Sequence, residues 1–240
     1  MITGIDNFIR HLRSEGYHPR SDKHSNSLSC SVVGDLLSRC SVIRSQAAAG
    51  DLVFSFNFDL LQGTSAWNVD LVLGTPSPAD RQAVNEGEMR RAPTSTVRIA
   101  VEHKAVITEH RKAVKNRKRD FEAHHEHVHR YSASAIAGGV LIVSGASTFK
   151  SPLREEITQH RDPKALVEHC IDQMRAVSQR PGSTGHGLDA KAVVAVDLDN
   201  VNRERTGLYT SPPAPQVGDP LHYDAFIERI CTLYEERFST

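Results

Sequence analysis

Two short stretches, Trp67–Leu73 (WNVDLVL) and Thr96–Ile107 (TVRIAVEHKAVI), indicate the fold and the chemistry of this chain. Both are rich in β-branched and aliphatic residues, which is typical of buried strands. Both also carry charged residues within apolar sequence, Asp70 in the first and Glu102 and Lys104 in the second. A charged side chain there is costly unless it is paired or binds a metal ion. The two stretches therefore predict two strands that carry a functional site.

Further strands are expected on both sides of this pair. The stretch Asp51–Leu60 alternates apolar and polar residues, and it predicts a hairpin partner for Trp67–Leu73 across a turn at residues 62–65. Continuous apolar runs at Ile136–Val143 and Ala192–Leu198 predict buried strands. The early strands are therefore expected to form a meander.

Helices are predicted where apolar residues recur at helical spacing or where a long polar stretch lacks glycine and proline. The expected helices are Ile5–Glu15, Leu28–Cys40, Thr108–Tyr131, Leu166–Ser178 and Tyr223–Phe238. The later strands need helical crossovers, so this order predicts an α/β fold with a mixed sheet and helices on both faces. We expect a single domain with a core at about residues 28–143 and a C-terminal extension at residues 144–240.

Composition limits the possible partners of the chain. Its 29 basic and 29 acidic residues give a net charge of zero, so only a local basic patch can indicate a nucleic-acid partner. The apolar runs are too short to span a bilayer, and the N-terminus has no signal-peptide core. The four cysteines form no Cys-x-x-Cys pair. We therefore expect a cytoplasmic protein with no membrane partner and no zinc ribbon.

The acidic residues and the lysine have the chemistry of a magnesium site. Residues two apart in a strand share a face, so Glu102 and Lys104 can converge, and Asp70 joins them if the two strands are neighbours. Two carboxylates and the backbone carbonyl of His103 form an oxygen site suited to Mg²⁺. Lys104 is then placed to orient or deprotonate a water, or to stabilise negative charge in the transition state. Two other Asp-x-Lys sequences lie in a loop and at a strand start, and we expect no role for them: Asp162–Lys164 and Asp189–Lys191.

The pattern of Asp70 followed by Glu102-His103-Lys104, on the second and third strands after a helix, resembles the PD-(D/E)xK nuclease superfamily. Restriction endonucleases are its best-known members. The resemblance covers roughly residues 28–143, and it departs from the family pattern where Asn68-Val69-Asp70 replaces Pro-Asp. It implies a restriction-endonuclease-like mixed sheet with flanking helices, Mg²⁺ as cofactor and DNA as substrate.

The resemblance also implies an activity and further site residues. The leading expectation is a type II restriction endonuclease that acts as a homodimer, because cutting two strands needs two sites. One alternative is a repair, phage-defence or effector nuclease without fixed sequence specificity. Another is a catalytically inactive DNA-binding module in which the three charged residues form a buried ion-pair network. Many family members add an acid from the preceding helix, and the candidates here are Asp35 first, then Glu15, with Asp59 weaker.

The helix predicted at Thr108–Tyr131 carries the basic patch. Six basic residues lie within nine positions with no acid among them, and they predict contacts with DNA phosphates: Arg111, Lys112, Lys115, Arg117, Lys118 and Arg119. The alternative is a solvated charged face. Four histidines follow and are expected to be exposed polar residues: His124, His125, His127 and His129. A Zn²⁺ site at His125 and His129, one turn apart, would need ligands that the sequence does not indicate.

Overall fold

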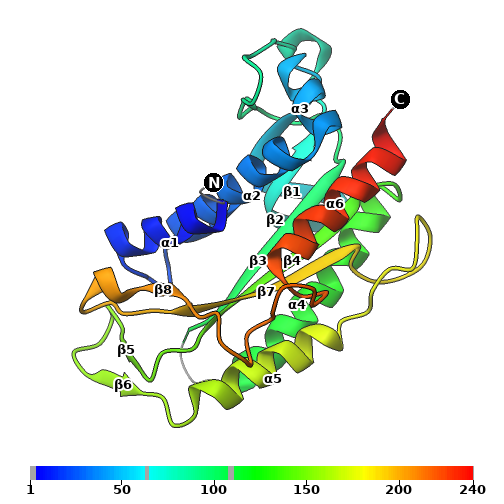
Figure 1. The fold of residues 1–240 in the computed structure, drawn as a ribbon. Helices are drawn as coiled ribbons and strands as arrows, with labels where there is room; N and C mark the ends of the chain where they lie inside the picture. Colours follow the sequence, from blue (N-terminus) through cyan, green and yellow to red (C-terminus); the bar gives the residue numbers. More distant parts are fainter. Residues whose placement is uncertain (1–3, 63–64, 108–110, 240) are drawn as a thin grey trace.

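The computed structural model describes residues 4–62, 65–107 and 111–239 (Figure 1). Its α-helices are α1 (Gly4–Glu15), α2 (Lys23–Arg39), α3 (Ser41–Ala48), α4 (Arg111–Tyr131), α5 (Pro163–Arg175) and α6 (Tyr223–Phe238). Its strands are β1 (Val53–Gln62), β2 (Ser65–Gly74), β3 (Ile99–Val106), β4 (Ile136–Ser144), β5 (Thr148–Lys150), β6 (Ile157–Gln159), β7 (Ala190–Asp197) and β8 (Gly207–Leu208). Short 3₁₀ turns lie at Pro78–Asp80 and Arg203–Arg205.

Six strands form one mixed sheet in the order β1-β2-β3-β4-β7-β8. Strands β1, β2 and β3 form an antiparallel meander, whereas β3, β4 and β7 run parallel. Parallel neighbours need crossover connections, and α4 and α5 lie in those connections. The predicted α/β class, with a mixed sheet and flanking helices, is therefore confirmed.

Helices cover both faces of this sheet and enclose two apolar cores. Buried residues of α1, α2, α3 and α6 form one core, and those of α4 and α5 form the other. Strand β4 lies between β3 and β7, and each of its residues is buried, as its continuous apolar run predicted. Strand β7 belongs to this sheet, and helix α6 belongs to the core that also contains α1, α2 and α3, although both elements follow residue 143.

Two glycines in β4 let helices approach the sheet closely. A Cβ atom on Gly138 would lie 3.2 Å from the Phe226 ring of α6, and one on Gly139 would lie 2.8 Å from the Phe121 ring of α4. A side chain at either position would push the helix outward. Gly139 therefore helps to set the depth at which α4 packs beside β3.

Two elements near the N-terminus differ from the expectation. Helix α2 begins at Lys23 rather than at Leu28, and α3 was not predicted. Cys40 separates the two helices with an extended backbone, φ −107° and ψ 108°. The first turns of α2 bury His24 and Ser29, and buried polar residues leave no trace in an apolar periodicity. The predicted turn at residues 62–65 and the predicted helix start at residue 108 fall partly outside the described residues.

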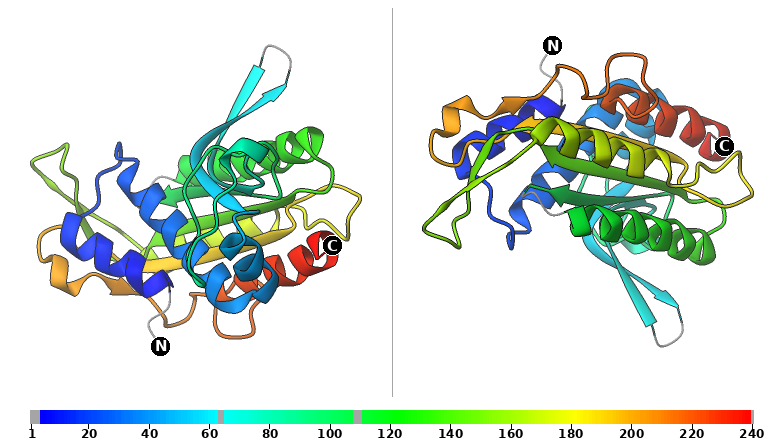
Figure 2. Two further views of the ribbon diagram at one scale, coloured as in Figure 1. Left: turned by 90° about the horizontal axis from the view of Figure 1, so that it is seen from above. Right: turned by 90° about the horizontal axis from the view of Figure 1, so that it is seen from below.

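The β1–β2 hairpin extends beyond the rest of the sheet (Figure 2). Its strands pair from Val53–Gly74 to Gln62–Ser65, far past the three residue pairs that join β2 to β3. Among the described residues, no helix is both long enough and apolar enough to span a membrane.

Candidate active site

The candidate site lies where β2 separates from β3. The last residue pair between these strands is Leu71 with Val101. Asp70 and Glu102 are the next residues along each strand, so they occupy opposing positions just beyond the last pair. Backbone groups and side chains at this point are released from the ladder and can bind other partners.

Asp70 uses the opening between the strands. Its Oδ2 atom accepts a hydrogen bond of 2.7 Å from the backbone N–H of His103 in β3. Its Oδ1 atom accepts a 2.7 Å hydrogen bond from the Ser25 hydroxyl of α2. The carboxylate is half-buried and is held by two charge-assisted hydrogen bonds. Ser25 was not predicted, because it lies in the part of α2 that the apolar pattern missed.

Glu102 and Lys104 form an ion pair on β3. The Lys104 amine contacts Glu102 Oε1, and only 4% of the Glu102 side chain is exposed. Burial and repulsion by Asp70 raise the pKa of Glu102 to about 7, although Lys104 acts in the opposite direction. The repulsion follows from the opposing positions of the two residues on neighbouring strands. The Oε2 atom of Glu102 is buried and accepts no hydrogen bond from any described residue.

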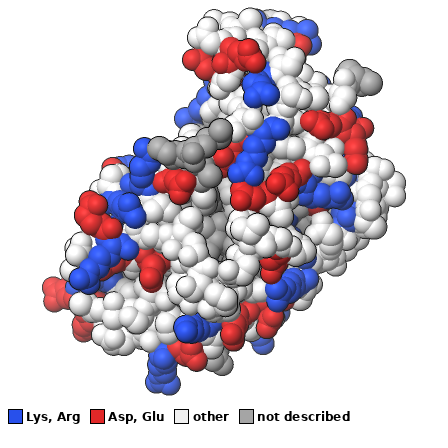
Figure 3. Space-filling view, viewed as in Figure 1, with Lys and Arg blue, Asp and Glu red and all other residues white. Residues whose placement is uncertain are grey.

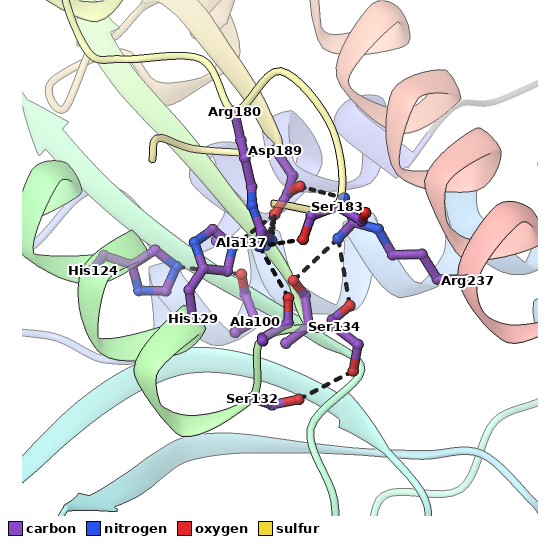
Figure 4. A network of polar contacts seen from close by, with 12 residues as sticks. Ala100, His124, His129, Ser132, Ser134, Ala137, Arg180, Ser183, Asp189 and Arg237 are labelled. Atoms are coloured by element: carbon purple, nitrogen blue, oxygen red, sulfur yellow. Dashed lines mark hydrogen bonds and ion pairs between the residues drawn. The ribbon is translucent and has the colours of Figure 1, made fainter. Parts of the chain in front are cut away.

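His124 of α4 packs against the same carboxylate. Its Nδ1 atom lies 3.9 Å from Glu102 Oε2, and its Nε2 atom lies 3.3 Å from the Ala100 carbonyl (Figure 4). Burial lowers the pKa of His124 to about 3, so the ring is neutral at physiological pH. One electrostatic group therefore lies between β2, β3 and α4, and its members are Lys104, Glu102, Asp70 and His124.

His103 follows Glu102 on β3, and its ring lies on the other face of the strand, toward α2. Its Nδ1 atom is 3.4 Å from the Ser29 hydroxyl of α2. Burial lowers the pKa of this ring to about 4, against the opposing field of Asp70. The N–H and C=O of one strand residue point to the same edge. The His103 carbonyl therefore faces the edge of β3 on which Asp70 lies.

The structure does not bring the other candidate acids to this group. Asp35 accepts a 2.9 Å hydrogen bond from the Gly4 N–H. It lies ten residues beyond Ser25 on α2, which is about 15 Å along a helix. Glu15 pairs with Lys23, and Asp59 accepts a hydrogen bond from Asn68.

The site has few side chains that could hold a metal ion. Within residues 4–62, 65–107 and 111–239, no three His, Cys, Asp or Glu side chains are arranged to hold one. Mg²⁺ commonly binds through one or two carboxylates and keeps several waters. The buried Oε2 atom of Glu102 fits such a cation, because it has no hydrogen-bond partner among the described residues.

The basic residues of α4 are partly neutralised. Arg117 pairs with Asp120 at 3.0 Å, and Lys118 pairs with Glu122. Lys115 and Arg119 are exposed, and no pairing with an acid is found for either among the described residues. The side chains of two further candidates lie outside the described residues: Arg111 and Lys112.

A hollow of about 310 Å³ lies beside the candidate site. It begins at Ala105, directly after Lys104, and is lined by Arg117 of α4, Arg154 and Tyr17. In α/β sheets, ligands bind outside the carboxyl ends of the parallel strands, which is where this hollow lies. The face covered by α1, α2 and α6 differs from this hollow, because basic and acidic side chains are mixed there (Figure 3).

The prediction that the four α4 histidines are exposed was wrong, because two of them are buried and two are half-buried. His124 and His125 are 0% and 1% exposed. His127 stacks on Trp67 of β2, and His129 lies 2.9 Å from the Asp189 carboxylate. The histidine pattern misled because a helix so rich in charge gives few apolar positions from which to identify its buried face.

The other two Asp-x-Lys sequences, for which no role was expected, have structural roles. Asp162 caps α5 by accepting a 2.9 Å hydrogen bond from the Ala165 N–H. Lys191 donates to the carbonyls of the last turn of α5 and the residues after it: Met174, Arg175 and Val177. A lysine at this position also interacts favourably with the helix dipole.

Asp189 joins three elements in a buried polar network (Figure 4). Its carboxylate lies 2.6 Å from the Arg237 guanidinium of α6 and 2.9 Å from His129 of α4. It also accepts a 2.9 Å hydrogen bond from the Ala137 N–H of β4. Burial alone would raise the pKa of Asp189, but the His129 and Arg237 hydrogen bonds outweigh it and lower the pKa below its usual value.

Comparison with protein-family models, curated proteins and solved structures found no match to this chain.

Proposed function

We propose that this protein is a divalent-metal-dependent DNA endonuclease of the restriction-endonuclease-like fold. The observation that carries the proposal is the separation of β2 from β3, which puts Asp70 and Glu102 at opposing positions with Lys104 on the Glu102 carboxylate. Strand β4 follows through α4, which agrees with the α-β-β-β-α-β order of the PD-(D/E)xK nucleases.

The residues that would hold the cation are Asp70, Glu102 and the backbone carbonyl of His103. A bound Mg²⁺ would supply Lewis-acid polarisation of the scissile phosphate and a lower pKa for an attacking water. The Lys104 side chain is 23% exposed, and its amine would orient that water or stabilise the negative charge that develops on the phosphate. Lys115 and Arg119 would contact the DNA backbone, and Arg117 and Arg154 line the hollow beside Lys104.

The biological role that we favour is a type II restriction endonuclease acting as a homodimer. A repair, phage-defence or effector nuclease without fixed specificity is the alternative within the class. One observation favours a catalytically inactive binding module on the same scaffold. Both oxygens of Asp70 already accept hydrogen bonds from Ser25 and His103, as expected for a structural carboxylate.

Digestion of supercoiled plasmid and of several linear DNAs, with Mg²⁺ and with a chelator, tests the proposal. Cleavage that requires the cation supports a nuclease, and discrete fragments support restriction over indiscriminate cutting. Asp70→Asn and Glu102→Gln should lose cation affinity and cleavage together, because both carboxylates would hold the ion. DNA binding without cleavage by any divalent cation would support the binding module instead.

A further inference from the structure

Two buried atoms in the candidate site face each other without a partner. Glu102 Oε2 and His124 Nδ1 are each inaccessible to solvent, and neither has a hydrogen-bond partner among the described residues. The two atoms lie 3.9 Å apart, which is too long for a hydrogen bond. A buried acceptor without a partner is costly, so two of them at one point indicate a missing third group.

The His124 ring is oriented as a metal ligand would be. Its Nε2 atom lies 3.3 Å from the Ala100 carbonyl, so the Nε2 atom carries the proton that points at that oxygen. Nδ1 is then left with a lone pair directed at Glu102. Metal-binding histidines commonly donate their other ring N–H to a backbone carbonyl or carboxylate, which fixes both the tautomer and the ring plane.

The separation of the two atoms lets one cation contact both of them. Ligand atoms lie about 2.0–2.2 Å from ions such as Mg²⁺ and Zn²⁺, so two ligands of one ion are at most about 4.4 Å apart. The observed 3.9 Å lies within this limit. Asp70 and Lys104 also act electrostatically on His124, so the ring belongs to the same charged group as the acids.

We propose that His124 Nδ1 and Glu102 Oε2 bind the same divalent cation, and that this nitrogen ligand makes the site prefer Mn²⁺ over Mg²⁺. This proposal depends on the proposed function in one respect, which is the position of the catalytic cation at Glu102. Imidazole binds transition-metal ions well, whereas Mg²⁺ prefers oxygen ligands throughout. Other positions around the cation would be filled by the His103 carbonyl, phosphate oxygens and waters, one of which would connect the cation to Asp70.

Electron spin-echo measurements on the Mn²⁺-loaded protein test this without any substitution. The expected result is a ¹⁴N modulation from a directly bound imidazole, which changes to the ¹⁵N pattern when only histidine is ¹⁵N-labelled. Mn²⁺ should also bind more tightly than Mg²⁺ in equilibrium competition. Failure to bind Mn²⁺, or bound Mn²⁺ without nitrogen modulation, would overturn the proposal and leave a water or a proton to fill the gap.

A matched pair of variants assigns the nitrogen to one residue. His124→Leu should remove the modulation and weaken Mn²⁺ binding at least about 10-fold. His125→Leu changes the neighbouring buried histidine of α4 and should keep both properties. The reverse result, loss in His125→Leu and retention in His124→Leu, would refute the assignment.

Plasmid digestion in Mg²⁺, run in parallel, separates this proposal from the proposed function. Cleavage by a protein that shows no nitrogen modulation would overturn the His124 ligand and leave the nuclease intact. A nitrogen signal that depends on His124, in a protein that cuts no DNA, would support the metal site and refute the nuclease.

Discussion

Replacing His125 by leucine should make the protein more resistant to acid. His125 lies on α4, is 1% exposed, and neither of its ring nitrogens has a hydrogen-bond partner among the described residues. Its ring packs edge-on against His186, with the centroids 4.3 Å apart. Burial, followed by the fields of His186 and His129, lowers the pKa of His125 to about 4.

The sign and size of the effect follow from proton linkage. The unfolded chain binds a proton at His125 with a pKa of about 6.5, and the native protein does so only near pH 4. As pH falls through this window, the unfolded state gains a proton that the native state does not, so native stability decreases. Between pH 8 and pH 5 the loss from this one residue is about 2 kcal/mol.

Urea denaturation of the metal-free wild type and His125→Leu at pH 8 and pH 5 measures this loss directly. The stability of the variant relative to wild type should rise by about 2 kcal/mol on going to pH 5. Equal stability differences at both pH values would refute the assignment of a buried, neutral His125.

Three further variants test the DNA surface and the polar contacts of the fold. Replacing Lys115 and Arg119 by alanine should weaken DNA binding and lower the slope of log affinity against log salt concentration by about two, as measured by fluorescence anisotropy. Ser25→Ala removes a 2.7 Å hydrogen bond to Asp70 and should cost about 2 kcal/mol of unfolding free energy, measured in urea. Asp189→Asn leaves two arginines buried without a counter-charge and should cost about 3–5 kcal/mol, seen as a lower melting temperature.

The fold was predictable where apolar residues alone report burial. The alternation in Asp51–Leu60 predicted β1, the apolar run at Ile136–Val143 predicted β4, and α6 has the predicted bounds of Tyr223–Phe238. These elements pack through aliphatic and aromatic side chains, so periodicity in the sequence matches periodicity in space. The short strands β5, β6 and β8 contain three residues or fewer and offer no such period.

The candidate site was predictable only in part, because much of it is buried and polar. Asp70, Glu102 and Lys104 stood out as charges inside apolar strands, and the structure places Asp70 and Glu102 at opposing positions. Ser25 and His124 did not stand out. A serine or histidine in a polar helix has the same local signature whether it faces solvent or a carboxylate across the fold.

Cleavage by Lys104→Ala tests the central claim most directly, because Lys104 is the residue that would act on the reaction without holding the cation. Cleavage rate and DNA affinity are measured side by side across a titration of Mg²⁺ and of Mn²⁺. Lys164→Ala changes the exposed lysine of another Asp-x-Lys sequence, in the first turn of α5, and is the control. The account predicts that Lys104→Ala cuts about 10² to 10³ times more slowly with DNA affinity retained, while Lys164→Ala cuts like the wild type. A Lys104→Ala protein that cuts at the native rate would contradict it, as would a wild type that binds DNA and never cuts.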